Sequence, residues 1–187
     1  MPTYAVIIAL WGSRLAYSPV VIRWHVTMIV AIITCLVPLC AIISLKRLGI
    51  ISDPGLNNRT ERPIPYLVTG LAYVACAFYL WRANAPSWLW LFMVGATVAT
   101  AISVIVNTRW KISAHMAAAG GVVAMIFRMI ELGVGVGSST LLCLASIAVL
   151  AAGLVGTARI YLDRHTLMQV IVGTANGFLC VYLISML

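Results

Sequence analysis

The chain has 187 residues, of which 63% are apolar and only 9% are charged, and its formal net charge is +8. An ordinary globular domain carries roughly 25% charged residues, so this composition excludes a disordered protein and leaves too few charged side chains to cover a soluble enzyme. Together with a mean hydropathy of +1.08, it predicts an integral membrane protein made of a single domain, residues 1–187.

Apolar runs follow one another along the whole chain. The first runs from Tyr4 to Tyr17; it is short and is interrupted by Arg14. The longer runs lie near residues 25–45, 65–82, 87–108, 114–132, 138–158 and 165–186. Each has about the 20 residues that a helix needs to cross the hydrocarbon core of a bilayer. We therefore expect an all-α fold, a polytopic membrane helical bundle with six or seven transmembrane helices.

Positive residues gather at the breaks between these runs, as they do in the loops of membrane proteins. They form no continuous basic stripe, so the net charge gives no reason to expect a nucleic-acid partner. Within the runs, Pro38 is expected to kink its helix. Gly173 and Gly177 form a GxxxG pattern, which favours close packing against another helix. The alternating glycines of 133–137 predict a turn, because no strand precedes them and no phosphate-loop Lys follows.

Successive spanning helices run in opposite directions, so alternate breaks lie on the same side of the membrane. One side, which we call the site face, holds the breaks near 46–64, 109–115 and 158–165. This assignment depends only on the number of runs between the breaks. It therefore holds whether or not the first apolar stretch crosses the membrane.

The site face carries nearly all of the reactive side chains. Several basic residues that converge on one point can bind phosphate through charge-assisted hydrogen bonds, and a serine adds a neutral donor. A histidine whose ring is oriented by another group can act as the nucleophile in phosphoryl transfer, and a second histidine can protonate the leaving oxygen. The candidate residues are Arg59, Arg62, Lys111, Ser113, His115, Arg159 and His165, with Gln169 one turn into the last run.

No metal ion or other cofactor is expected at this face. The breaks lack the carboxylate-rich cluster that a magnesium-dependent phosphotransferase uses. The chain also lacks an HExxH motif, which disfavours a zinc protease. Arginine side chains can supply the positive charge that the reaction needs.

Three short motifs occur in these breaks, in a defined order. They are Arg62-Pro63, then Ile112-Ser113-Ala114-His115, and then Ala158-Arg159 followed by five residues, His165, three residues and Gln169. The pattern resembles the type 2 phosphatidic acid phosphatase superfamily of membrane lipid phosphatases and vanadium haloperoxidase-like proteins, over about residues 53–177. The family motifs are Lys-x6-Arg-Pro, Pro-Ser-Gly-His and Ser-Arg-x5-His-x3-Asp. The first motif looks closest to a short bacterial membrane branch with a Glu-Arg-x-x-Pro-Tyr pattern, here Glu61 to Tyr66.

The resemblance implies a role for each matching residue. Phosphate binding is implied for Arg62, Ser113 and Arg159. The resemblance further implies that His115 is the general acid. It implies that His165 is the nucleophile, which becomes a phosphohistidine during the reaction.

Two departures from the family pattern bear on the chemistry. The motif Lys would fall at Gly55, so Arg59 or Lys111 is expected to supply its charge. The final Asp is Gln169, whose position four residues after His165 places both on one helix face. Its amide oxygen can accept the imidazole N–H, but it cannot stabilise an imidazolium as a carboxylate does. In the serine-protease triad, replacing the Asp by an amide lowers the rate by about 10⁴.

We therefore expect a membrane-embedded phosphatase that acts on a lipid phosphate or diphosphate through a phosphohistidine. The implied substrates are an isoprenyl diphosphate, phosphatidylglycerol phosphate or a lipid A phosphate. Gly55 and Gln169 favour one alternative, a lipid-phosphate-binding or scaffold member without full catalysis. A small transporter is a second alternative, because polar groups within a bundle can mark a substrate path. Against it, the ionisable groups lie at one face of the membrane and not at its midplane.

The resemblance implies a bacterial inner-membrane protein whose site faces the periplasm. Of the 12 Lys and Arg residues, eight lie on the site face and four on the other side. Taken alone, the positive-inside rule would place the site face in the cytoplasm. Phosphate binding accounts for Arg59, Arg62, Lys111 and Arg159, and without them the count is four against four. The resemblance then favours the periplasm.

Overall fold

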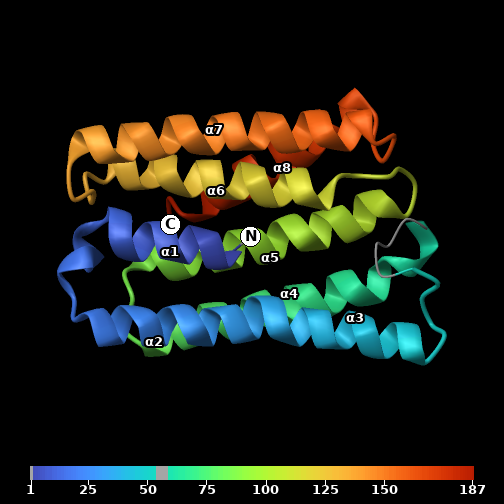
Figure 1. Cartoon of the computed structure of the whole chain (residues 1–187), viewed down its shortest axis with the longest axis horizontal. Coiled ribbons are helices and arrows are strands. Elements are labelled where there is room, and N and C mark those ends of the chain that lie inside the picture. Colours follow the sequence, from blue (N-terminus) through green and yellow to red (C-terminus); the bar gives the residue numbers. More distant parts are fainter. Residues whose placement is uncertain (1, 54–58) are drawn as a thin grey trace.

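The computed structural model describes residues 2–53 and 59–187 and shows a bundle of helices that lie side by side (Figure 1). The α-helices are α1 (Pro2–Gly12), α2 (Val20–Ala31), α3 (Val37–Arg47), α4 (Pro63–Arg82), α5 (Ser87–Asn107), α6 (Ala114–Glu131), α7 (Ser138–Tyr161) and α8 (Leu167–Ile184). Among the described residues there is no strand, only an isolated bridge between Ser13 and Gly135. The predicted all-α fold is confirmed.

Within residues 2–53 and 59–187, six helices are long and apolar enough to cross a membrane. One is continuous from Val20 to Arg47 and combines α2, the π-helical segment Ile32–Leu36 and α3. The other five are α4 to α8. Many large apolar side chains on these helices point outward, as they do in a protein whose surroundings are lipid. The chain is an integral membrane protein with a polytopic helical bundle.

The first apolar stretch does not form one helix from Tyr4 to Tyr17. Helix α1 ends at Gly12, and a separate 3₁₀ turn follows at Arg14–Tyr17. The break lies at Ser13, whose extended backbone lets its hydroxyl accept the N–H of Leu15 at 3.1 Å. With 11 residues, α1 is only about 16 Å long, roughly half of the hydrocarbon core.

Pro38 lies just after the π-helical segment, inside a helix that continues past it. Proline has no N–H to donate to the carbonyl of Thr34, four residues earlier. The chain accommodates this with a wider turn, in which the N–H of Val37 donates to the carbonyl of Ile32, five residues earlier. The irregularity expected at Pro38 therefore takes the form of a π-helical turn.

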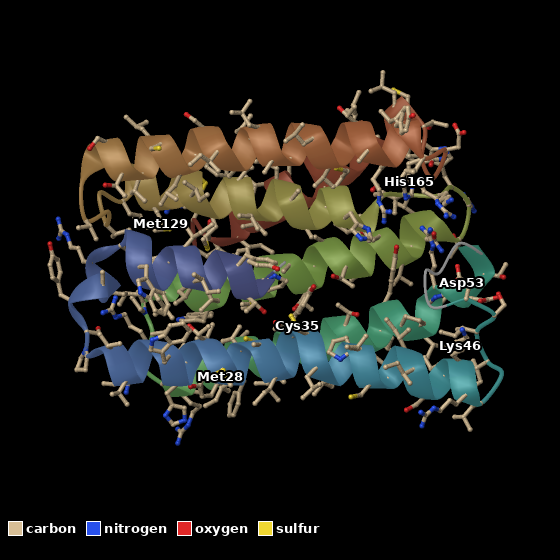
Figure 2. The ribbon with its side chains drawn as sticks, viewed as in Figure 1. Met28, Cys35, Lys46, Asp53, Met129 and His165 are labelled. Carbon is tan, nitrogen blue, oxygen red and sulfur yellow. The ribbon has the colours of Figure 1, made fainter. Side chains whose placement is uncertain are left out.

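The three connections predicted to share the site face do lie at one end of the bundle (Figure 1). They join α3 to α4, α5 to α6 and α7 to α8. Figure 2 places Lys46, Asp53 and His165 together at this end. The glycine-rich turn between α6 and α7 lies at the other end, where Gly133 has a positive φ of 59°.

Helices α6 and α8 make the most extensive helix–helix contact in the described part of the chain, and glycines make it possible. A Cβ added to Gly177 would overlap the carbonyl of Ala117, and one added to Gly173 would lie 2.6 Å from the carbonyl oxygen of Ser113. The backbones of the two helices therefore touch, as the GxxxG pattern predicted. This contact sets the position of the α6 N-terminus relative to the start of α8, and both of these lie at the site face.

A polar network joins the same two helices at the opposite end. Arg128 pairs with Glu131 at 2.6 Å and donates to the carbonyl of Ser185 at 3.3 Å. The hydroxyl of Tyr182 donates to the second oxygen of Glu131. The C-terminal turn of α8 is thereby held against α6 at the far face.

Candidate functional site

The three connections of the site face bring basic and histidine side chains from distant parts of the sequence into one cluster. The charges of Arg62, Arg159 and Arg164 all act on Lys111, and those of Lys111, Arg62 and Arg159 all act on His165. The predicted residues that gather here are Arg62, Lys111, Ser113, His115, Arg159, His165 and Gln169. The side chain of Arg59, like residues 54–58 with Gly55, lies outside the described part of the chain.

Arg62 caps the start of α4 and is almost fully buried, with 6% of its surface exposed. Pro63 follows at the first helical position, where its missing N–H removes no helical bond. The guanidinium donates through Nη1 to the carbonyl of Ile112 at 3.3 Å and is hydrogen-bonded to the hydroxyl of Tyr66. These two acceptors are neutral, and burial strengthens the attraction of the guanidinium for an anion.

A contact with Ser52 holds the segment that precedes Arg62. The carboxylate of Glu61 accepts the backbone N–H of Ser52 at 2.8 Å and its hydroxyl at 2.9 Å. These bonds join two residues of the connection between α3 and α4. They fix the backbone immediately before Arg62.

Ser113 stands at the N-terminus of α6, and its side chain is completely buried. Its backbone N–H donates to the carbonyl of Gln169 at 3.4 Å, but its hydroxyl has no hydrogen-bond partner among the described residues. A buried hydroxyl without a partner costs roughly 1–3 kcal/mol. The first N–H groups of a helix also favour an anion. This end of α6 therefore offers unused donors next to the basic cluster.

His115 and Arg159 are in direct contact, although 44 residues separate them in the sequence. The Nη2 atom of Arg159 lies 2.5 Å from Nδ1 and 3.1 Å from Nε2 of the imidazole. Since a guanidinium can only donate, the ring of His115 accepts this bond and is unprotonated at the accepting nitrogen. An entering phosphate would compete with the ring for the guanidinium.

His165 is buried, with 8% of its surface exposed, and lies in the short connection between α7 and α8. Its Nδ1 lies 3.0 Å from Oε1 of Gln169, so the contact predicted from the i,i+4 spacing is confirmed. An amide oxygen only accepts, so Nδ1 carries the proton and Nε2 keeps its lone pair. Burial is the main cause that lowers the pKa of His165 to about 4. The bond to Gln169 opposes this shift, and the nearby cations add to it. The ring is therefore neutral at pH 7.

Lys111 is another group of the cluster whose pKa is shifted. Partial burial lowers its pKa, and the charges of Arg62, Arg164 and Arg159 lower it further. The cations thus repel one another, which an anion among them would relieve. Within the described part of the chain, no group of three His, Cys, Asp or Glu side chains could hold a metal ion.

Two features of the site escaped the sequence analysis. Gln169 belongs to a capping box, because its Oε1 also accepts the N–H of Thr166 at 3.3 Å while the Thr166 hydroxyl accepts the N–H of Gln169. The Thr-x-x-Gln spacing is a known signal of this motif. The bond between Tyr66 and Arg62 also has a local signal, because the two residues lie four apart at the start of α4.

Comparisons with protein-family models, with curated proteins and with solved structures give no significant match to this chain.

Proposed function

We propose that this chain is a membrane-embedded phosphatase that removes phosphate from a lipid phosphate or diphosphate. The observation that carries the proposal is the state of His165, whose Nδ1 is held by Gln169 and whose Nε2 keeps its lone pair beside Arg62, Lys111 and Arg159. An oriented neutral imidazole among cations is the arrangement that a phosphate-attacking nucleophile needs. The three motifs that resemble the type 2 phosphatidic acid phosphatases supply the same residues.

The proposed reaction has two steps. In the first, Nε2 of His165 attacks phosphorus and the bond from phosphorus to the lipid oxygen breaks. His115 gives its proton to that oxygen once the phosphate has drawn Arg159 away and the ring has been protonated. In the second step, His115 takes a proton from water, the water oxygen attacks phosphorus, and the bond to Nε2 breaks to release phosphate. Arg62, Arg159 and the hydroxyl of Ser113 hold the phosphoryl oxygens throughout.

A second candidate is a lipid-phosphate-binding member of the same family with weakened catalysis. The neutral amide of Gln169 favours it, because an amide stabilises the imidazolium-like charge of a phosphohistidine less well than a carboxylate. The two candidates bind the same ligand at the same residues. They differ in whether phosphate is released.

Phosphate release from a panel of lipid phosphates, measured on the purified full chain, separates the two. Phosphatase activity predicts release that His165→Ala abolishes, together with a phosphoprotein trapped by acid quench. The matched control is His25→Ala, which removes an exposed histidine of α2 outside the cluster and should leave release unchanged. Binding of the lipids without release would favour the second candidate.

We further propose that the protein lies in a bacterial inner membrane with its site face toward the periplasm. Arg62, Lys111 and Arg159 belong to the cluster. This supports leaving them out when the numbers of Lys and Arg on the two sides of the membrane are compared. A cysteine introduced at Leu48, whose side chain is exposed, in a background without the native cysteines, tests the orientation. Labelling of intact cells by an impermeant thiol reagent is expected. Labelling only after the membrane is broken would show that the site face lies on the cytoplasmic side.

A further inference from the structure

An apolar cavity of about 290 Å³ lies inside the bundle, below the basic cluster. Its walls come mainly from α4, α5, α6 and α8, and single residues of α1 and α3 complete them. His115 and Tyr66 line its end at the site face, and Phe92 and Val181 line its deep end. His115 also contacts Arg159, and Tyr66 also bonds to Arg62. The cavity and the polar site therefore share these two side chains.

The serine and threonine hydroxyl groups on the cavity wall do not make it a polar site. Those of Thr69, Thr100 and Ser103 donate to carbonyls of their own helices four residues earlier, at 2.8 Å in each case. Their hydrogen-bonding capacity as donors is used within the helix. The cavity accordingly offers mainly hydrocarbon and small alanine and glycine surfaces to a ligand. Such a space favours an apolar occupant.

The size of the cavity limits that occupant to about one chain. An apolar cavity of about 150 Å³ holds one benzene, so about twice this volume holds roughly twelve carbon atoms. Along α5 the lining runs from Ser103 to Phe92, which is a rise of about 16 Å. An extended chain advances about 1.2 Å per bond, so twelve carbons span about 13 Å. Volume and length thus agree on one extended chain, and a second chain would have to lie outside this cavity.

We propose that this cavity holds the first part of a single hydrocarbon chain whose phosphate lies in the basic cluster. The preferred substrate is then a phosphate or diphosphate on one alkyl or prenyl chain, and not a lipid that carries two acyl chains beside the phosphate. The placement of the phosphate in the basic cluster rests on the proposed function. The assignment of the chain to the cavity rests on the walls and dimensions of the cavity. The remainder of a long chain leaves the bundle near the middle of the bilayer, because the cavity reaches only about half of its thickness.

Photocrosslinking tests the position of the chain without relying on catalysis. The probe is a dodecyl phosphate with a diazirine near its tenth carbon, added to the purified full chain in detergent. After irradiation, we expect the modified residues to include Phe92, Ala96 and Gly121, which line the deep half of the cavity. A tenfold excess of unlabelled dodecyl phosphate should remove this labelling, and the same excess of a two-chain phosphatidic acid should not. Labelling of outward-facing residues alone, or equal competition by both lipids, would overturn the proposal.

Variants on one helix give a matched comparison. Ala96→Phe fills the cavity and should lower the deep labelling at least tenfold, whereas Val98→Phe should not, because Val98 does not line the cavity and is 37% exposed on the same helix. Ala118→Leu, on the α6 wall, is a milder filling variant should Ala96→Phe fail to fold. If either folded filling variant labels like the unsubstituted protein, the assignment is wrong.

Phosphate release from the same preparations keeps the two proposals apart. Cavity labelling without release would support the chain site and refute the phosphatase. Release without cavity labelling would support the phosphatase and overturn the chain site. With both proposals correct, Ala96→Phe should lower release from dodecyl phosphate at least tenfold. It should leave release from butyl phosphate, which is too short to reach residue 96, within twofold.

Discussion

Replacing Gln169 by Glu tests how the proposed nucleophile is oriented. The two side chains have the same length, and either residue suits the third position of a capping box. Oε1 would therefore still accept the N–H groups of His165 and Thr166, now at 3.0 and 3.3 Å. The variant adds one negative charge beside the imidazole and changes little else. Its effect on rate and on pH dependence is then an effect of charge.

The magnitude follows from that geometry. Two opposite charges about 4 Å apart interact by about 4 kcal/mol at an effective dielectric constant of 20, which corresponds to an upper limit of about three pKa units. In the unsubstituted protein the pKa of His165 is lowered to about 4 by burial and the surrounding cations. His165 should therefore stay neutral down to about pH 4, and kcat/KM should fall only at lower pH. In Gln169→Glu this acid limb should move upward by about two to three pH units.

The rate should change as well. A carboxylate stabilises the charged ring of the phosphohistidine, so kcat at pH 8 should rise at least about tenfold, with the roughly 10⁴ of the serine-protease Asp as a ceiling. The assay is phosphate release from a single-chain lipid phosphate in mixed micelles, measured from pH 3 to 9. Thr166→Ala is the control, because it removes the cap, at about 0.5–2 kcal/mol of stability, without touching the imidazole. An unmoved acid limb in Gln169→Glu would show that His165 is not the titrating nucleophile.

Two further changes probe the packing and the unused donor. Gly177→Ala should lower the unfolding temperature in detergent, because the new Cβ would overlap the carbonyl of Ala117 and overpacking costs typically about 1–3 kcal/mol. Gly153→Ala on α7, where an added Cβ meets nothing within 4 Å, should leave the temperature unchanged or raise it, and equal losses would contradict the close contact of α6 and α8. Ser113→Ala should lower kcat/KM by roughly 10–100-fold through one lost bond to a charged oxygen, with no loss of thermal stability. A fall in stability without a fall in kcat/KM would mean that the hydroxyl is structural.

Local sequence patterns predicted the architecture well, for physical reasons. The length of an apolar run is set by the bilayer, so the six spans and their two faces could be read without any tertiary information. The contact of Gly173 and Gly177 with α6 follows from the same kind of local pattern. The N-terminal stretch was the exception, because the end of α1 depends on the bonding of one serine, Ser13.

Most members of the candidate cluster could be predicted from the sequence, but their pairings could not. The spacing of four residues across the start of α8 places Gln169 beside His165, which itself lies just before the helix, and this contact is present. The contact of His115 with Arg159 joins two helices, and no local rule reports which of several basic residues reaches the ring. The unpartnered hydroxyl of Ser113 and the cavity below His115 depend on how α4, α5, α6 and α8 pack together. Such features exist only once the whole bundle has formed.

The neutral amide of Gln169 has a consequence for the chemistry of the whole cluster. A capping box accepts Glu as readily as Gln, so the local structure of α8 does not require an amide at this position. The amide carries no charge that could offset the cations acting on His165, and burial together with Lys111, Arg62 and Arg159 lowers the pKa of His165 to about 4. The ring is then neutral at neutral and mildly acidic pH, as the proposed nucleophile must be, while the charge that it would gain on attack is less well stabilised. An incoming phosphate supplies the missing negative charge itself, so the substrate would complete the electrostatic environment that a carboxylate provides in the family pattern.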